Sequence, residues 1–348
     1  AIELLDSVVT YVQEGGRQIV LSDDVNNIVG EKTGIPVARI GEHERELLGN
    51  LEEIIHKHLI NQEHAVSLIG KSLRARSVGV KEDTKPIGSF LFLGPTGVGK
   101  TQTAKVLANV YFGSEKQILR FDMAEFAGNE GLSRLIGSQT SNQPGILTTS
   151  IKNRPASLLL LDEIEKAPPE VYNLLLTLLD EGYITDAYGR KVDCRNLFVI
   201  ATSNAAAELI REKVYEEVSG DDLQNSVVDY IQREHIFSPE FINRFDGVVV
   251  FEPLTQKHLI EVARLMFANL QKTLESKNIR LEITDELCAK LAQDGFDPAF
   301  GARPMRRVID LTIGDILGRA ILNGELKDGD KIKLVPGAEK LSYSIANS

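Results

Sequence analysis

One glycine-rich segment constrains this chain more than any other feature. Residues 94–101 follow the apolar run 89–93 directly, and they precede a helix-like stretch at 102–111. The segment reads Gly94-Pro95-Thr96-Gly97-Val98-Gly99-Lys100-Thr101. A strand that feeds such a turn at the start of a helix aims backbone N–H groups and the positive end of the helix dipole at one point. The segment therefore predicts a polyphosphate site, with Lys100 at the β and γ phosphates and Thr101 at Mg²⁺.

Two acidic residues at the end of a second apolar run give the next signal. The run 157–161 ends in Asp162-Glu163, about sixty residues after the glycine-rich segment. Phosphoryl transfer depends on positioning and electrostatics. Asp162 is therefore suited to bind Mg²⁺, often through a water molecule, and Glu163 is suited to orient and polarise the attacking water. An Asp-Glu pair that only caps a helix after a buried strand is the alternative.

Three further polar residues are candidates, each with an ordinary alternative. The apolar run 197–202 leads to Asn204, which is placed to hold the lytic water, although many strands end in Asn as a turn former. Arg244 follows a helix-like segment, and Arg303 opens another one. Each arginine fits either a salt bridge or contact with a γ-phosphate, and the residues alone leave these two roles open.

The order of apolar runs predicts an α/β fold with a second, smaller domain. Short apolar runs alternate with helical patterns up to residue 252, which is typical of a parallel sheet covered on both faces. These runs are Ser89–Leu93, Ile118–Asp122, Ser157–Asp162, Leu197–Thr202 and Gly247–Phe251. We expect a connector and remnant of a preceding module at 1–47, a large domain at 48–252, and a small, mostly helical domain at 253–348. Its helices are predicted at Thr255–Ser276, Thr284–Asp294 and Gly301–Asn323, before a terminal strand at Lys331–Val335.

Charge and composition exclude several classes of protein. The net charge of −11 argues against general nucleic-acid binding, which depends on phosphate neutralisation. The sequence has no run of 18 or more apolar residues, so it predicts no membrane-spanning helix. The first residues lack the pattern of a signal peptide. Because the chain begins at Ala1 inside a helical pattern, we expect a fragment or a processed chain. Cys194 and Cys288 are interpreted as ordinary core residues of a cytoplasmic protein.

Taken together, the motifs resemble the AAA+ ATPases of the Clp family, in particular the second ATPase module of the two-ring ClpB- and ClpC-like members. The resemblance covers about Thr33 to Val335 and rests on seven separated motifs in the right order. These are Thr33-Gly34-Ile35-Pro36-Val37, Pro86 to Thr101, Phe121-Asp122-Met123-Ala124-Glu125-Phe126, Leu161 to Ala167, Asp193-Cys194-Arg195-Asn196, Phe241 to Asp246, and Gly301-Ala302-Arg303-Pro304.

The resemblance implies a role for each candidate residue. Gly94 to Thr101 would be the Walker A loop for ATP and Mg²⁺, and Asp162 and Glu163 would be Walker B, with Glu163 catalytic. Asn204 would be sensor 1, Arg244 the arginine finger that completes a neighbouring subunit's site, and Arg303 sensor 2. Leu59 and Ile60 lie where the family lines the adenine pocket. A site shared between subunits implies a homo-oligomeric ring, in this family usually a hexamer that acts on polypeptide.

The chain departs from the family where the family carries its axial, substrate-gripping loop. After Arg134-Leu135-Ile136-Gly137 no aromatic residue follows until Tyr172, and the loop 138–146 is about four residues short. Ile146 would serve only weakly as a gripping side chain, because it lies next to a predicted helix start. Tyr183 and Tyr188 fit a second axial loop at Asp180–Val192, although a surface hairpin is the favoured interpretation. The segment 205–240 has no Ile/Leu-Gly-Phe tripeptide, which argues against a ClpP-type peptidase partner; its acidic stretch Glu216–Asp222 is expected to be a loop.

Three functions compete on this basis. The first is an ATP-driven, ring-forming Clp-type chaperone module that remodels or unfolds proteins. The alternative is an AAA+ ring that hydrolyses ATP without threading and serves as a switch or scaffold for a dedicated partner, because the axial aromatic is missing. A nucleic-acid motor is disfavoured by the acidic charge.

Overall fold

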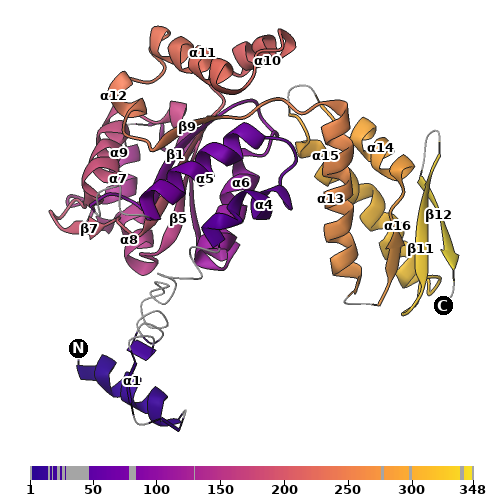
Figure 1. The fold of residues 1–348 in the computed structure, drawn as a ribbon, viewed down its shortest axis with the longest axis horizontal. Helices are drawn as coiled ribbons and strands as arrows, with labels where there is room; N and C mark the ends of the chain where they lie inside the picture. Colours follow the sequence, from indigo (N-terminus) through magenta and orange to yellow (C-terminus); the bar gives the residue numbers. More distant parts are fainter. Residues whose placement is uncertain are drawn as a thin grey trace.

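A computed structural model describes residues 2–14, 47–77, 84–337 and 341–346, apart from 129, 276–277 and 298–299, together with a few positions between 16 and 28. The expected Thr33–Val37 motif lies outside the described residues. The first helix, α1 (Ile2–Glu14), lies apart from the rest of the described chain (Figure 1).

A five-stranded parallel sheet forms the centre of the large domain (Figure 1). Its strand order is β2-β5-β8-β1-β9. The strands are β1 (Gly88–Leu93), β2 (Ile118–Asp122), β5 (Ser157–Asp162), β8 (Leu197–Ser203) and β9 (Gly247–Val250). All five coincide with predicted apolar runs to within a residue or two, because central strands covered on both faces are apolar throughout.

Alternation along each strand divides the core into two layers. Phe90 and Phe92 pack with the first layer of helices, whereas Leu91 and Leu93 pack with the second. The first layer contains α4 (Leu51–His56), α5 (Glu63–Ser77) and α6 (Lys100–Phe112). The second contains α7 (Gly131–Ile136), α8 (Ile146–Asn153), α9 (Pro169–Glu181), α10 (Ala207–Tyr215), α11 (Gly220–Arg233) and α12 (Pro239–Ile242). Short helices at Glu115–Gln117, Met123–Phe126 and Ile164–Lys166 join these elements.

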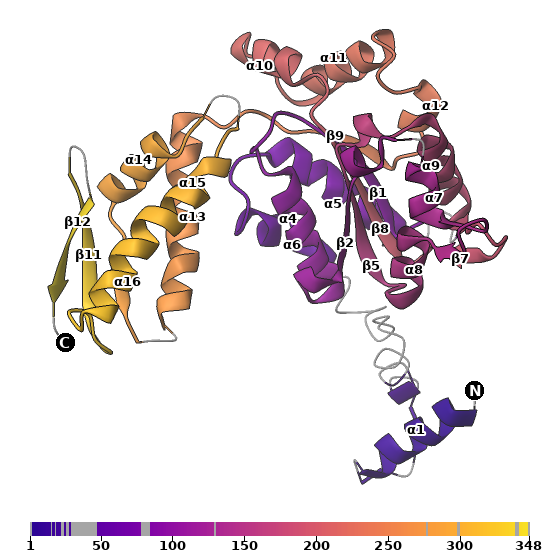
Figure 2. The same cartoon turned by 180° about the vertical axis from the view of Figure 1, so that it is seen from behind.

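The C-terminal part is a separate helical layer with a small sheet beside it (Figure 2). Its helices are α13 (Gln256–Glu275), α14 (Asp285–Asp294), α15 (Arg303–Val308) and α16 (Gly314–Leu322). Its strands are β10 (Arg280–Glu282), β11 (Lys331–Pro336) and β12 (Leu341–Ala346). The helix predicted at Gly301–Asn323 is interrupted by a π-helical turn at Ile309–Ile313, a feature that the apolar pattern did not reveal.

Several details differ from the sequence-based expectation. Strands β10 and β12 were not predicted, because three to six residues of mixed polarity give little periodic signal. The acidic stretch Glu216–Asp222 is only partly a loop, since α11 begins at Gly220. Cys194 and Cys288 are buried free thiols, as predicted, and burial raises the pKa of Cys194 to about 12. In the described part of the chain, no helix combines the length and the apolarity that crossing a membrane requires.

Candidate nucleotide site

The glycine-rich segment joins the carboxyl end of β1 to the start of α6, as the sequence predicted. Its turn depends on two glycines with positive φ, Gly97 at 79° and Gly99 at 115°. A side chain at Gly99 is disfavoured by this conformation, and its Cβ would lie 2.6 Å from a methyl of Leu59, which would have to move. Since Gly99 caps α6, the first amides of the helix point into this turn.

Lys100 lies buried inside the loop that it follows. Its Nζ donates to the carbonyls of Gly94 at 2.5 Å and Pro95 at 2.9 Å, and to Oδ1 of Asn204 at 2.9 Å. Burial and, to a smaller extent, Arg303 lower the pKa of Lys100 to about 8, against the opposing effect of Glu165, Asp162 and Glu163. The ammonium is thus poorly solvated, which favours exchange of these neutral carbonyls for an anionic phosphate.

Asp162 is buried at the end of β5 with both carboxylate oxygens already hydrogen-bonded. Oδ1 accepts from the Thr202 hydroxyl at 2.9 Å, and Oδ2 accepts from Nε of Arg120 at 2.6 Å. Thr202 belongs to the neighbouring strand β8 and Arg120 to the edge strand β2, so three adjacent strands meet here. Both carboxylate oxygens already accept hydrogen bonds. Asp162 is therefore better suited to contact a cation through a water molecule than to bind it directly, which would displace a donor.

Glu163 occupies a strained backbone position directly after Asp162. Its φ and ψ are 54° and 50°, in the left-handed region that residues other than glycine rarely adopt. Its amide lies 3.4 Å from the Thr202 hydroxyl. Such strain persists only where the surroundings impose it, and it clusters at functional sites. Here it turns the chain sharply out of β5, so that Glu163 does not continue the strand.

Asn204 connects the glycine-rich loop to the acidic segment. Its Oδ1 accepts from Lys100 and lies 3.4 Å from the Thr96 hydroxyl, while its backbone amide donates to Oε1 of Glu165 at 3.2 Å. The other Glu165 oxygen is buried without a hydrogen-bond partner among the described residues. Sequence analysis singled out Asn204 but missed Glu165, although a second acid two residues after Glu163 was a visible signal.

The small domain reaches this site through its Gly301-Ala302-Arg303 turn. The Ala302 amide contacts the Gly97 carbonyl at 3.4 Å, and a Cβ on Gly97 would lie 2.1 Å from the Phe300 carbonyl oxygen. This close approach brings Arg303 near enough to Lys100 to lower its pKa. In the described residues no carboxylate pairs with the Arg303 guanidinium. Two cations facing one loop without a shared anion are an arrangement suited to a phosphate group.

The residues expected around the adenine base also lie against the glycine-rich loop. Leu59 is buried beside Gly99, and Ile60 next to it is partly buried. Sequence analysis missed Gln62, a buried amide with a positive φ of 75°. Its side chain bonds both the carbonyl and the amide of Glu252, at 2.9 Å each, and contacts the Val98 carbonyl at 3.4 Å. Gln62 therefore ties the loop to the segment between the two domains.

The geometry fits a magnesium nucleotide. The loop presents amides and Lys100 to phosphates, and Thr101 and Asp162 supply hydroxyl and carboxylate oxygens, which are the ligand atoms that Mg²⁺ prefers. Bound Mg²⁺ would neutralise charge that develops on the phosphate oxygens. Among the described residues, no group of three or more His, Cys, Asp or Glu side chains is suited to hold a metal by itself.

Arg244 is the one predicted site residue that lies elsewhere. The Asp246 amide donates to the Ser89 carbonyl at 2.8 Å, so Arg244 lies near the amino end of β1, whereas the glycine-rich loop follows its carboxyl end. Five residues of extended strand separate the two levels by about 16 Å. This position is incompatible with contact between Arg244 and a phosphate in its own subunit.

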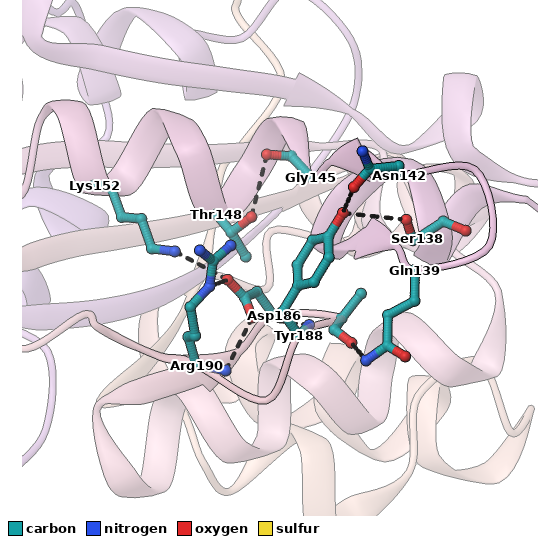
Figure 3. A network of polar contacts seen from close by, with 10 residues as sticks. Ser138, Gln139, Asn142, Gly145, Thr148, Lys152, Asp186, Tyr188 and Arg190 are labelled. Atoms are coloured by element: carbon teal, nitrogen blue, oxygen red, sulfur yellow. Dashed lines mark hydrogen bonds and ion pairs between the residues drawn. The ribbon is translucent and has the colours of Figure 1, made fainter.

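The loop that departs from the family pairs with the second loop (Figure 3). The first loop forms a minimal hairpin of β3 (Gly137–Ser138) and β4 (Gln143–Pro144) before α8. The second lies between β6 (Tyr183–Thr185) and β7 (Lys191–Asp193), the surface hairpin that the sequence favoured. The Tyr188 hydroxyl lies 3.1 Å from Oδ1 of Asn142 and 3.5 Å from the Ser138 carbonyl, and Gln139 donates to the Ala187 carbonyl at 2.5 Å.

Asp186 is a buried anchor for the second loop, which lies between β6 and β7. Its side chain is only 2% exposed and accepts from Lys152 of α8 at 3.0 Å, from Nε of Arg190 at 2.8 Å, and from the amides of Tyr188 and Arg190. Burial opposes the charge of Asp186, yet these donors hold its pKa well below the usual range. Arg190 also stacks on the Tyr188 ring, which is 37% exposed. The two loops thus form one hydrogen-bonded unit with an exposed aromatic ring.

Comparison with known proteins agrees with this geometry. A family model described as an AAA domain of the Cdc48 subfamily matches residues 85–248, and a model of the C-terminal, D2-small domain of ClpB matches residues 254–334. The chaperone protein ClpB of Aquifex aeolicus is 41% identical over 319 residues, covering 89% of this chain and 32% of that protein. ClpB of Meiothermus ruber is 41% identical over 331 residues, covering 94% and 38%.

A ClpC relative gives the same result. The negative regulator of genetic competence ClpC/MecB of Bacillus subtilis is 41% identical over 323 residues, covering 90% of this chain and 40% of that protein. The chain therefore spans about a third to two fifths of the length of these relatives. On these grounds the chain is a Clp-type AAA+ ATPase module, corresponding to the second module of ClpB- and ClpC-like proteins.

Proposed function

We propose that this module hydrolyses ATP within a ring of six like subunits and uses the energy to remodel or unfold polypeptides. One observation carries the hydrolytic part. Lys100, Asp162, Asn204 and Arg303, contributed by four separate segments, converge on one glycine-rich loop. Glu163 follows Asp162 in a strained turn, where it is suited to polarise the attacking water.

The ring is supported by the position of Arg244. This arginine cannot reach the phosphates of its own subunit, so a catalytic role requires that it completes the site of a neighbour. The domain division at residues 252 and 253 is part of the same proposal. With Arg303 on the small domain and Gln62 holding the segment between the domains, loss of the γ-phosphate would alter how the small domain sits against the large one.

Polypeptide contact is assigned to the paired loops. The hairpin at 137–144 has no aromatic residue, whereas Tyr188 of the adjoining loop exposes its ring and is held by Asn142 and Arg190. We assign the contact with substrate to the Tyr188 ring. The relatives named chaperones support a polypeptide as the substrate class, and a cytoplasmic location and the absence of a ClpP-type partner stay predictions.

The test is ATP-dependent unfolding of a folded fluorescent protein that carries an unstructured tag. Loss of fluorescence that requires both ATP and Glu163 is the expected result. A second candidate, a ring that hydrolyses ATP without threading and acts on a dedicated partner, is favoured by one feature, the 138–146 loop without an aromatic residue. Robust hydrolysis without any unfolding of the tagged protein would support that candidate instead.

A further inference from the structure

Arg244 is held on its own subunit by one carboxylate. Its Nη1 lies 2.9 Å and 3.2 Å from the two oxygens of Asp180, in the last turn of α9. Glu240 is the only other acid near it in the described residues, at 3.6 Å from Nη2, and its side chain is exposed. Asp180 therefore provides the main anchor for this guanidinium.

Both ends of this contact are fixed by the start of β1 and the residues just before it. On one side, the Asp246 amide bonds the Ser89 carbonyl, and the Ser89 amide bonds the Asp246 carboxylate at 2.9 Å. On the other side, α9 ends at Gly182, where a Cβ would lie 2.0 Å from the Thr84 carbonyl oxygen. The segment that carries Arg244 is thus packed against the start of β1, and the end of α9 against the residues that precede this strand.

The anchor leaves part of the guanidinium available. A bidentate, fork-to-fork pair would engage two nitrogens of the arginine. Here both carboxylate oxygens face the same nitrogen, Nη1, while Nη2 has only the distant, exposed Glu240. Nε is buried without a hydrogen-bond partner among the described residues. The contact therefore fixes the direction of the side chain without occupying the Nη2 edge.

We propose that Asp180 is a positioning residue for Arg244: it holds the finger extended from the amino edge of the sheet so that Nη2 meets the phosphates of the adjacent subunit. This inference rests on the proposed role of Arg244 in a neighbour's site. The effect of Asp180 is assigned to the nucleotide of the neighbouring subunit, because Asp180 acts through Arg244, which lies about 16 Å of strand from the loop of its own subunit.

The experiment is subunit mixing in the complete protein. Rings of Asp180→Ala alone should hydrolyse ATP about tenfold or more slowly than wild type, with KM for ATP changed less than about twofold, because only the orientation of a transition-state contact is lost. Glu163→Gln subunits lack hydrolysis but keep the finger. Mixed one to one, they should give the Asp180→Ala subunits intact fingers and raise the turnover above that of either variant alone.

Two controls separate this inference from its premise. Arg244→Ala mixed with Glu163→Gln must regain turnover; if it does not, the finger does not act between subunits, and the proposed ring site and this inference both fail. If that mixture recovers and the Asp180→Ala mixture does not, only the role of Asp180 is overturned. Asp180→Glu, which keeps the carboxylate, should restore most of the rate, and Glu240→Ala should match wild type. Should Asp180→Ala fail to assemble, Asp180→Asn replaces it with the same expected recovery.

Discussion

The two working regions of this molecule differ in how they are built. At the nucleotide site, adjacent strands supply Arg120 and Thr202 as donors to the buried Asp162 carboxylate, and the segments that follow strand ends carry Lys100 and Asn204. At the paired loops, contacts run between two short surface hairpins through Tyr188, Gln139 and Asn142, with a single buried anchor in Asp186. The first region depends on the fold as a whole, whereas the second can change without changing the fold.

This difference explains where the chain keeps to its family and where it departs. A residue in a buried cluster at strand ends cannot be replaced without leaving a partner unsatisfied. A surface hairpin can change in length and in its side chains, provided that its ends stay together; here Gly137 and Gly145 hold them close, since a Cβ on Gly145 would lie 2.2 Å from the Ile136 carbonyl carbon. Substitutions in the two regions are therefore expected to have different effects.

The largest effect is expected from Glu163→Gln. This substitution removes the base but keeps the size of the side chain, so turnover should fall by at least about 100-fold. Nucleotide binding should persist, since the glycine-rich loop and Lys100 are unchanged. The measurements are steady-state phosphate release and equilibrium binding of a fluorescent nucleotide. Turnover near the wild-type rate would show that another group polarises the water.

The pH dependence of ATP binding should follow Lys100. Burial lowers its pKa to about 8, and only the protonated form attracts phosphate. Affinity is therefore full below pH 8 and should fall as the pH rises above it, by about tenfold per unit while the free amine loses its proton. Nucleotide titrations between pH 7 and 9.5 test this, with Lys100→Arg as a variant that stays charged throughout. An affinity of the wild type that is flat up to pH 9.5 would contradict the assignment.

At the loops, the ring of Tyr188 is expected to matter only when polypeptide is present. Tyr188→Ala should reduce stimulation of the ATPase by unfolded protein about threefold to tenfold, the equivalent of about 1 kcal/mol of aromatic contact. Tyr188→Phe keeps the ring and should retain most of the stimulation despite losing the hydroxyl bond to Asn142. The basal rate should be the same in both variants. If Tyr188→Phe and Tyr188→Ala lose the same amount of stimulation, the effect comes from the hydrogen bond to Asn142 and thus from the structure of the loops.

The smallest effect is expected from Arg120→Ala. Without the guanidinium, the buried Asp162 carboxylate loses one of its two donors and should attract a cation more strongly. The Mg²⁺ concentration that gives half-maximal nucleotide binding should then fall about two- to fivefold, within the range of one partly exposed ion pair. A titration with Mg²⁺ at fixed nucleotide concentration measures this shift. An increase in the required Mg²⁺ would mean that Arg120 helps to place Asp162 rather than competing with the ion.

Much of the fold and of the nucleotide site was predictable from the sequence, for identifiable reasons. Strands buried on both faces are continuous apolar runs, and the residues that end them, Asp162 and Asn204, are polar exactly where such runs stop. Hydrogen-bond partners that lie inside the apolar runs were missed. Nothing along the chain says that Arg120 of β2 contacts Asp162 of the adjacent strand β5. The same holds for Gln62, whose role depends on contact with Glu252, 190 residues away.

The loops were predictable only in part. The sequence showed that an aromatic residue is missing after Gly137, and it favoured a hairpin around Tyr188, which is confirmed. It gave no sign that the two segments bond to each other, since Tyr188 and Asn142 are separated by 46 residues and neither belongs to a periodic pattern. The anchoring of Arg244 by Asp180 was likewise invisible, because the two residues lie 64 positions apart.

The most direct test of this account is the ATPase rate of the complete protein with and without a permanently unfolded polypeptide such as casein. If the intact nucleotide site serves a ring whose paired loops contact substrate, the rate should rise clearly when the polypeptide is added, and the rise should depend on Tyr188. A robust rate that the polypeptide leaves unchanged would contradict the account, because hydrolysis would then run without any link to the loops.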